Sequence, residues 1–283
     1  MQRQSISKFA ALCLIVQTLF VCATTFGGTE TTDADALGAL KPPEILAQLV
    51  KTFPGSTGES ADKSSQYFIV QRHLDQYAVA VGSNLTVQAI TTILDQTKQN
   101  EVLQANVFFW LHQSGVVNKL NAQDRLSAYR HIEKVVSQSQ GESFQVGVGL
   151  LRRLLEPEGV NAMGSAEEAK VAGTAIAEMT REHLIQGIHS DKDEAITRSV
   201  LEDVRKLRKR DMLDAKSYSE LLRSCTTNVS MRSSIRVRTA TLLIQESTNS
   251  AEIARLLQAE AENPRNDEAV RKEFGGLINK GKP

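Results

Sequence analysis

The feature that most constrains this fold is the spacing of its apolar residues, which recur every three or four positions from about residue 43 onward. The polar residues between these stretches fit helix ends: Asn100 precedes one stretch and Gly115 follows it, and Asn121 with Asp124 forms a capping-box pattern. Alternating β-branched segments are not found at the spacing of an all-β fold, nor between helices as in an α/β fold. The sequence therefore predicts an all-α protein of ten to twelve helices.

Individual boundaries follow from the same signals. We expect helices to begin at Asp62 or Ser64, at Ser83 and at Ser165, the last of these running to about His189. Gly141 is expected to end the helix that starts at Asn121.

The N-terminus has the order of a secretory signal peptide. Arg3 and Lys8 precede an almost wholly apolar run over residues 9–22, and Ala23 offers a small residue for cleavage before Thr24. Fourteen residues are too few for a spanning helix, which needs about 20. We expect no stable membrane span after cleavage of residues 1–23 and a secreted or periplasmic location; lipid attachment at Cys22 is the disfavoured alternative, because Val21 before it is not small.

Cleavage also removes Cys13 and Cys22, so Cys225 is the only cysteine left and no disulfide can form within the mature chain. Residues 24–36 are rich in threonine, glycine and acids and are expected to form a disordered tether. Residues 37–283 then form a single α-helical, repeat-like domain that must be stabilised by its core.

Charge excludes some partners. The whole chain has 33 basic and 33 acidic residues, and loss of Arg3 and Lys8 gives the mature protein a net charge of −2. This balance lacks the excess of basic residues that is typical of proteins that bind nucleic acid or an anionic membrane surface. The one dense basic run, residues 205–210, is interpreted as a solvated helix C-terminus, with a patch for an acidic partner as the alternative.

Helix starts recur at about 40 residues. The first members of successive pairs begin near Asp62, Glu101 and Glu142 and again near Asp191 and Ser230. Near the C-terminus, Val237-Arg238 opens one unit and Val270-Arg271 opens another 33 residues later, after a short acidic turn. In this order the last 50 residues resemble HEAT-type helical repeats. The resemblance implies antiparallel helix hairpins stacked as a right-handed solenoid; a compact multi-helix bundle is the alternative, because any bundle of such helices repeats at a similar length.

No residue pattern predicts catalysis, a cofactor or a metal. His183 and His189 lie six residues apart, on opposite faces of a helix, and the other three histidines are isolated. A nucleophile elbow is absent, and Gly147-Val148-Gly149 lies within an apolar helix, where it indicates close helix packing. The sequons at Asn84 and Asn228 matter only if the source is a eukaryote.

One aromatic cluster stands out at Phe108, Phe109 and Trp110. Neighbours on a helix are about 100° apart, so the three cannot all enter one core; they are assigned mainly to the core, with one reaching a helix seam or a binding surface. Together these features predict an exported, non-enzymatic scaffold that binds a protein or peptide partner. The alternatives are an extracytoplasmic hydrolase or lyase with a dispersed active site, and a structural component of the cell envelope.

Overall fold

The computed structural model describes residue 37 and residues 40–52, 63–82, 85–156, 163–185, 194–246 and 250–280. Within these ranges every regular element is helical, which confirms the all-α prediction. The elements are α3 (Pro42–Thr52), α4 (Lys63–Ala80), α5 (Val87–Thr97), α6 (Glu101–Ser114), the short 3-10 helix η1 (Val116–Lys119), α7 (Ala122–Ser137), α8 (Gly141–Leu155), α9 (Ala166–Ile185), α10 (Glu194–Lys209), α11 (Ala215–Thr227), α12 (Ser233–Glu246), α13 (Ser250–Glu262) and α14 (Glu268–Lys280).

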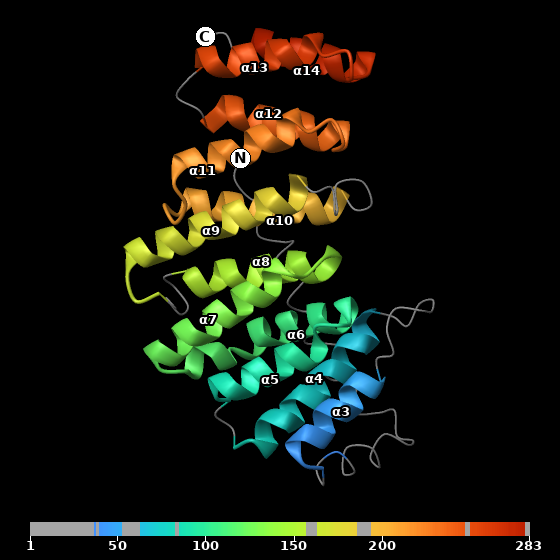
Figure 1. The fold of residues 1–283 in the computed structure, drawn as a ribbon, viewed down its shortest axis with the longest axis vertical. Helices are drawn as coiled ribbons and strands as arrows, with labels where there is room; N and C mark the ends of the chain where they lie inside the picture. The colour runs from blue at the N-terminus through green and yellow to red at the C-terminus, as the bar shows by residue number, and fades with distance from the viewer. Residues whose placement is uncertain are drawn as a thin grey trace, which may run out of the picture.

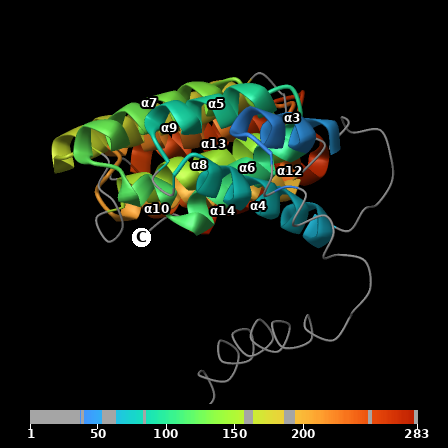
Figure 2. The ribbon, with the colours of Figure 1, turned by 90° about the horizontal axis from the view of Figure 1, so that it is seen from below.

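The helices are arranged in two layers. Figure 1 shows them following one another along the longest axis, from α3 and α4 at one end to α13 and α14 at the other. Seen along that axis, odd-numbered helices form one layer and even-numbered helices the other (Figure 2). Each even-numbered helix from α4 to α12 contacts the next even-numbered one, and most consecutive helices, such as α11 and α12, contact each other across the layers. We call these the even layer and the odd layer.

Several helices are capped at their N-terminal ends by the side chains predicted from the sequence. The side-chain oxygen of Asn100 accepts a hydrogen bond from the amide of Leu103 at 3.0 Å, and Asn121 accepts one from the amide of Asp124 at the same distance. Gly115 ends α6 in the left-handed conformation with φ of 60°.

Two expected boundaries were wrong. The helix expected to be capped by Ser83 begins at Val87, and Thr86 is its cap, accepting from the amide of Ala89. Gly141 does not end a helix: α7 ends at Ser137, and Gly141 is the first residue of α8. The carboxylate of Glu101 on α6 accepts from the amide of Glu142 at 3.0 Å, so this start depends on a residue 41 positions away. The expected end of α9 near His189 lies outside the described residues, within which α9 reaches Ile185.

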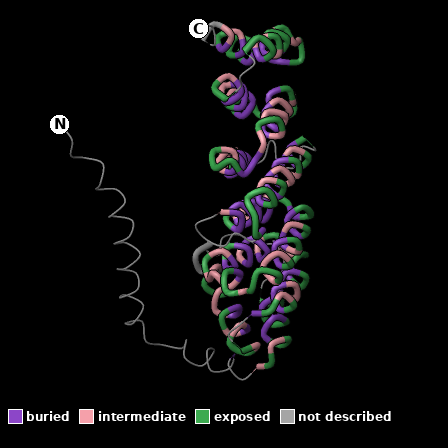
Figure 3. Tube along the Cα trace, turned by 90° about the vertical axis from the view of Figure 1, so that its left-hand side faces the viewer, coloured by how far each residue is buried: buried purple, intermediate pink, exposed green. Residues whose placement is uncertain are grey.

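The core lies between the layers. Buried residues gather on the facing sides of the helices (Figure 3), in one cluster of contacting apolar side chains that runs from Ile45 on α3 to Leu277 on α14. Gly147 confirms the close packing expected of its segment, because a Cβ atom there would lie 2.5 Å from Val136 and 3.2 Å from Phe108. Cys225 is buried, as expected of a small apolar residue. The expected signal peptide with its cleavage site between Ala23 and Thr24, and the expected tether over 24–36, lie outside the described residues.

Candidate functional site

A partly exposed group of aromatic rings joins α4 to α6. The Tyr67 and Phe109 rings pack edge to face at a centroid distance of 4.9 Å. The Phe68 ring lies 6.0 Å from that of Tyr67, and the His112 ring lies 6.4 Å from that of Phe109. Phe68 is 66% exposed and Phe109 38%. We call these four residues the aromatic patch; exposed aromatic rings of this kind are the usual anchors of protein interfaces.

The aromatic patch forms because other helices pack against α6 on several sides. This helix contacts α4 and α8 in its own layer and α5 in the other, and its apolar residues therefore point in several directions. Phe108 and Trp110 are fully buried, while Phe109, about 100° from each, emerges at the surface. The Trp110 indole donates to a carboxylate oxygen of Asp75 at 2.8 Å and thereby holds α4 against α6.

The rings of the patch are neutral near pH 7. Burial lowers the pKa of His112 below its usual value, and the nearby guanidinium groups of Arg153 and Arg152 lower it further. Burial, followed by the negative charge of Asp75, raises the pKa of Tyr67. The patch therefore presents apolar surface without a formal charge on its rings.

Next to the patch, α8 is joined to α10 by buried charges. The Arg152 guanidinium donates to Asp203 at 2.9 Å and also contacts Glu156. Arg210 pairs with the same Glu156 at 2.8 Å. These charges are satisfied within the protein, so their role is to fix two helices of the even layer rather than to face a partner.

The basic run over residues 205–210 stands at the C-terminal end of α10, as the sequence indicated. Its charges have partners in the protein itself: Arg205 donates to Glu246 on α12 at 3.2 Å, and Lys206 pairs with Asp203 at 3.3 Å. Arg205 therefore joins α10 to α12, while Lys209 and Arg210 at the end of the run are exposed, as expected of a solvated helix C-terminus.

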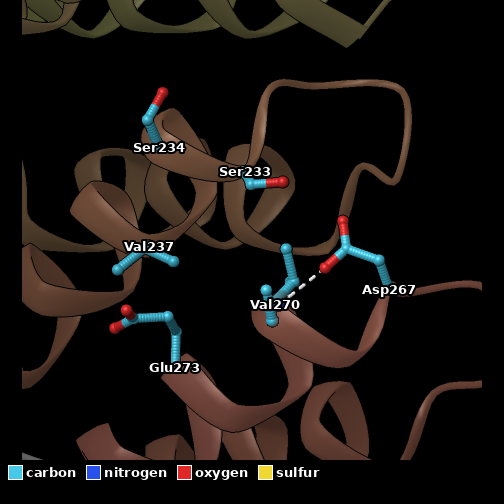
Figure 4. Close-up of a pocket in the computed structure, with 7 residues that line it drawn as sticks. Ser233, Ser234, Val237, Asp267, Val270 and Glu273 are labelled. Carbon is cyan, nitrogen blue, oxygen red and sulfur yellow. Dashed lines mark hydrogen bonds between the residues drawn. The ribbon is translucent and has the colours of Figure 1, made fainter.

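A pocket opens between α12 and α14, close to the N-terminal ends of both helices (Figure 4). Its volume is about 310 Å³. Sequence reasoning missed it, since it depends on how far apart two helices of one layer lie. Its lining residues are Ser233, Ser234, Val237, Asp267, Ala269, Val270 and Glu273.

The histidines have structural surroundings. His183 is buried with its ring stacked on Phe144 at 3.7 Å, and His73 is buried with its Nδ1 at 2.8 Å from the carbonyl oxygen of Ile69. Among the residues that the structure describes, no three His, Cys, Asp or Glu side chains come together as metal ligands.

Burial raises the pKa of the Cys225 thiol to about 12, so the thiolate form is scarce near neutral pH. His189 and the sequon residue Asn84 lie outside the described ranges, and Asn228 follows α11, where its side-chain oxygen accepts from the amide of Ser230.

No protein-family model, curated protein or solved structure matches this chain. In the part of the chain that the structure describes, none of the helices has both the length and the apolar character needed to cross a bilayer.

Proposed function

We propose that this protein is an exported, HEAT-like scaffold that binds a protein or peptide partner through its even layer. The observation that carries the proposal is the aromatic patch, in which Phe68 exposes two thirds of its surface on a rigid two-helix support. Aromatic residues supply a disproportionate share of binding free energy in protein interfaces, because they bury a large area at a small entropic cost.

The repeat architecture, a right-handed solenoid of helix hairpins, is supported by helix spacing. Even-layer helices begin at residues 63, 101, 141, 194, 233 and 268, at intervals of 38, 40, 53, 39 and 35 residues. The long interval, from the start of α8 to the start of α10, includes residues 157–162 and 186–193, which lie outside the described ranges. Stacked hairpins present an extended face made of one layer, which suits an elongated partner.

Side-chain hydrogen bonds repeat the same interval. Where neighbouring units meet, donor and acceptor are separated by about one unit of sequence. Examples are Thr174 to Asp214 (40 residues), Arg181 to Glu220 (39) and Arg205 to Glu246 (41). Contacts of this kind favour stacked units of equal length over a bundle with unrelated connections.

Export is the other half of the proposal and rests on the N-terminal sequence. We expect the exported protein to begin at Thr24, and a Cys22→Ser variant to be processed identically. N-terminal sequencing and intact mass decide this; a mature chain that starts at Cys22 and carries the added mass of lipid would contradict it.

The binding function can be tested with a phage-displayed library of random peptides panned on the immobilised mature chain. We expect peptides with large apolar or aromatic residues to be enriched, and the enrichment to be lost with Phe68→Ser/Phe109→Ser. Val171→Ser is a matched control, because Val171 on α9 is 65% exposed and belongs to the odd layer. Enrichment that survives in the double variant, or that Val171→Ser also abolishes, would overturn the assignment to this patch.

A further inference from the structure

The pocket between α12 and α14 combines an apolar floor with acidic walls. Val237 of α12 and Val270 of α14 face it, together with Ala269. Figure 4 shows Asp267, which directly precedes α14, and Glu273 of α14 to either side of Val270. The two valines belong to the two Val-Arg pairs of the repeat pattern, so the pocket lies where corresponding positions of successive units meet.

Both carboxylates keep acceptor capacity toward the pocket. One oxygen of Asp267 accepts a hydrogen bond from the amide of Val270 at 2.8 Å and caps α14. The second oxygen of this carboxylate can accept a further hydrogen bond. For Glu273, no lysine, arginine or histidine nitrogen of the described residues lies within salt-bridge distance. Arg236, which is close to Asp267, is already engaged by Glu260 at 2.7 Å.

The other groups near the opening are compensated. The Ser234 hydroxyl is bonded to the Glu194 carboxylate, which also pairs with Arg198 and Arg232. The N-terminal ends of α12 and α14 each contribute about half a positive charge, and the Asp267 cap offsets that of α14. The lining therefore carries an excess of negative charge, which favours a cation over an anion.

We propose that this pocket binds the side chain of a lysine or arginine from the partner protein. The aliphatic stem of such a side chain would lie along Val237, Ala269 and Val270 with its cationic end at the Glu273 carboxylate, while the Asp267 carboxylate adds to the negative potential of the lining. With a volume of about 310 Å³, the pocket has room for a long side chain together with water. The inference rests on the proposed function, since it assigns a specificity site to the same even layer.

The test is a titration of the isotopically labelled mature protein, followed by amide chemical shifts, with Nα-acetyl-lysine amide as the probe. Nα-acetyl-norleucine amide is the matched control ligand, because it keeps the stem and lacks the ammonium group. We expect the lysine probe to shift the amides of Ser233, Val237 and Val270 with a Kd on the order of 1 mM, and the norleucine probe to leave them unchanged.

Variants locate the charge that matters. Glu273→Gln is expected to weaken binding of the lysine probe about fivefold, and Asp267→Asn to weaken it while still capping α14. Glu268→Gln, on the same helix but outside the pocket, is the control and should leave Kd unchanged. Equal shifts from both probes, or undiminished affinity in Glu273→Gln, would overturn the inference.

The result is separable from the test of the aromatic patch. Phe68→Ser/Phe109→Ser should bind the lysine probe as the unaltered protein does, because the patch lies on α4 and α6. If the probe binds while no peptide depends on the patch, the proposed function fails at the patch and the pocket stands. If peptides depend on the patch and the probe does not bind, only the pocket assignment fails.

Discussion

At the scale of single residues, stability depends on places where two segments approach without room for a side chain. Gly173 on α9 is such a place, because a Cβ atom there would stand 1.7 Å from the carbonyl oxygen of Met212. The obstacle is backbone, which cannot move aside as a flexible side chain can. We expect Gly173→Ala to lower the free energy of unfolding by about 1–3 kcal/mol, measured by urea denaturation.

Gly276→Ala is the matched control for that measurement. A Cβ atom at Gly276, also within a helix, meets nothing within 4 Å. Alanine is the better helix former, so this variant should be more stable than the unaltered protein by about 0.5–1 kcal/mol. Equal effects of the two substitutions would contradict the close approach of α9 to Met212.

Arg236 is the most heavily bonded buried charge. It is 3% exposed, donates to Glu260 and to Asn266 at 2.7 Å each, and donates to the carbonyl oxygen of Thr226 at 2.9 Å. Its guanidinium also lies 5.4 Å from the centre of the Phe274 ring. Arg236→Met would leave the Glu260 carboxylate buried without its cation, and we expect a loss of about 3–5 kcal/mol of unfolding free energy.

Arg238 provides the comparison on the same helix. It is exposed, and its contact with Glu202 is 3.8 Å long. Arg238→Met should change the unfolding free energy by less than about 0.5 kcal/mol. If Arg236→Met were as mild as Arg238→Met, the buried pair would not hold α12 to α13 as the structure indicates.

Asp214 gives the stability a pH dependence. Burial on its own would raise the pKa of its carboxyl, but hydrogen bonds from the amide and hydroxyl of Ser217 and from the Thr174 hydroxyl outweigh burial and lower that pKa to about 2. The carboxylate therefore stabilises the folded state above its ordinary pKa of 3.8, and this contribution is lost as the pH falls toward 2.

Comparison with Asp214→Asn, which keeps a capping side chain, isolates the effect. Urea midpoints of the two proteins should differ by a constant amount between pH 7 and pH 5, with the unaltered protein more stable, and the gap should narrow from pH 4 downward. A gap that stays constant to pH 3 would show that the charge of Asp214 makes no contribution.

At the scale of elements, local sequence was sufficient where a helix end is made by its own residues. The caps at Asn100 and Asn121 and the stop at Gly115 involve partners only a few positions away, so their sequence signals are complete. Gly141 was misassigned because glycine with positive φ serves at either end of a helix, and here Glu101 completes the start of α8 from 41 residues away. No local pattern contains that information.

The aromatic patch shows the same limit. Helical geometry showed that one of Phe108, Phe109 and Trp110 had to leave the core, but which one depends on how α6 contacts α4, α5 and α8. No sequence pattern predicts that Tyr67 and Phe68, about 40 residues earlier, lie beside Phe109. The pocket between α12 and α14 likewise depends on the positions of two helices, although both of its valines belong to the Val-Arg pairs of the sequence.

At the scale of the whole molecule, the twelve described α-helices form two layers along one axis, with a core that continues from α3 to α14. The sequence predicted the helical class and an interval near 40 residues, and neither requires an elongated shape. The shape follows from which helices meet: even-numbered helices contact even-numbered ones in order, and the aromatic patch and the pocket consequently lie toward opposite ends of one layer.

The central proposal is that the chain is a stacked array of helix hairpins, and small-angle scattering of the mature protein tests it most directly. Six levels of helices spaced 8–10 Å apart give a length of roughly 50–60 Å. We expect a radius of gyration above the value of about 18 Å for a compact globule of this chain length, and an asymmetric distribution of interatomic distances with a long tail. A radius of gyration near 18 Å with a symmetric distribution would contradict the array and favour a compact bundle.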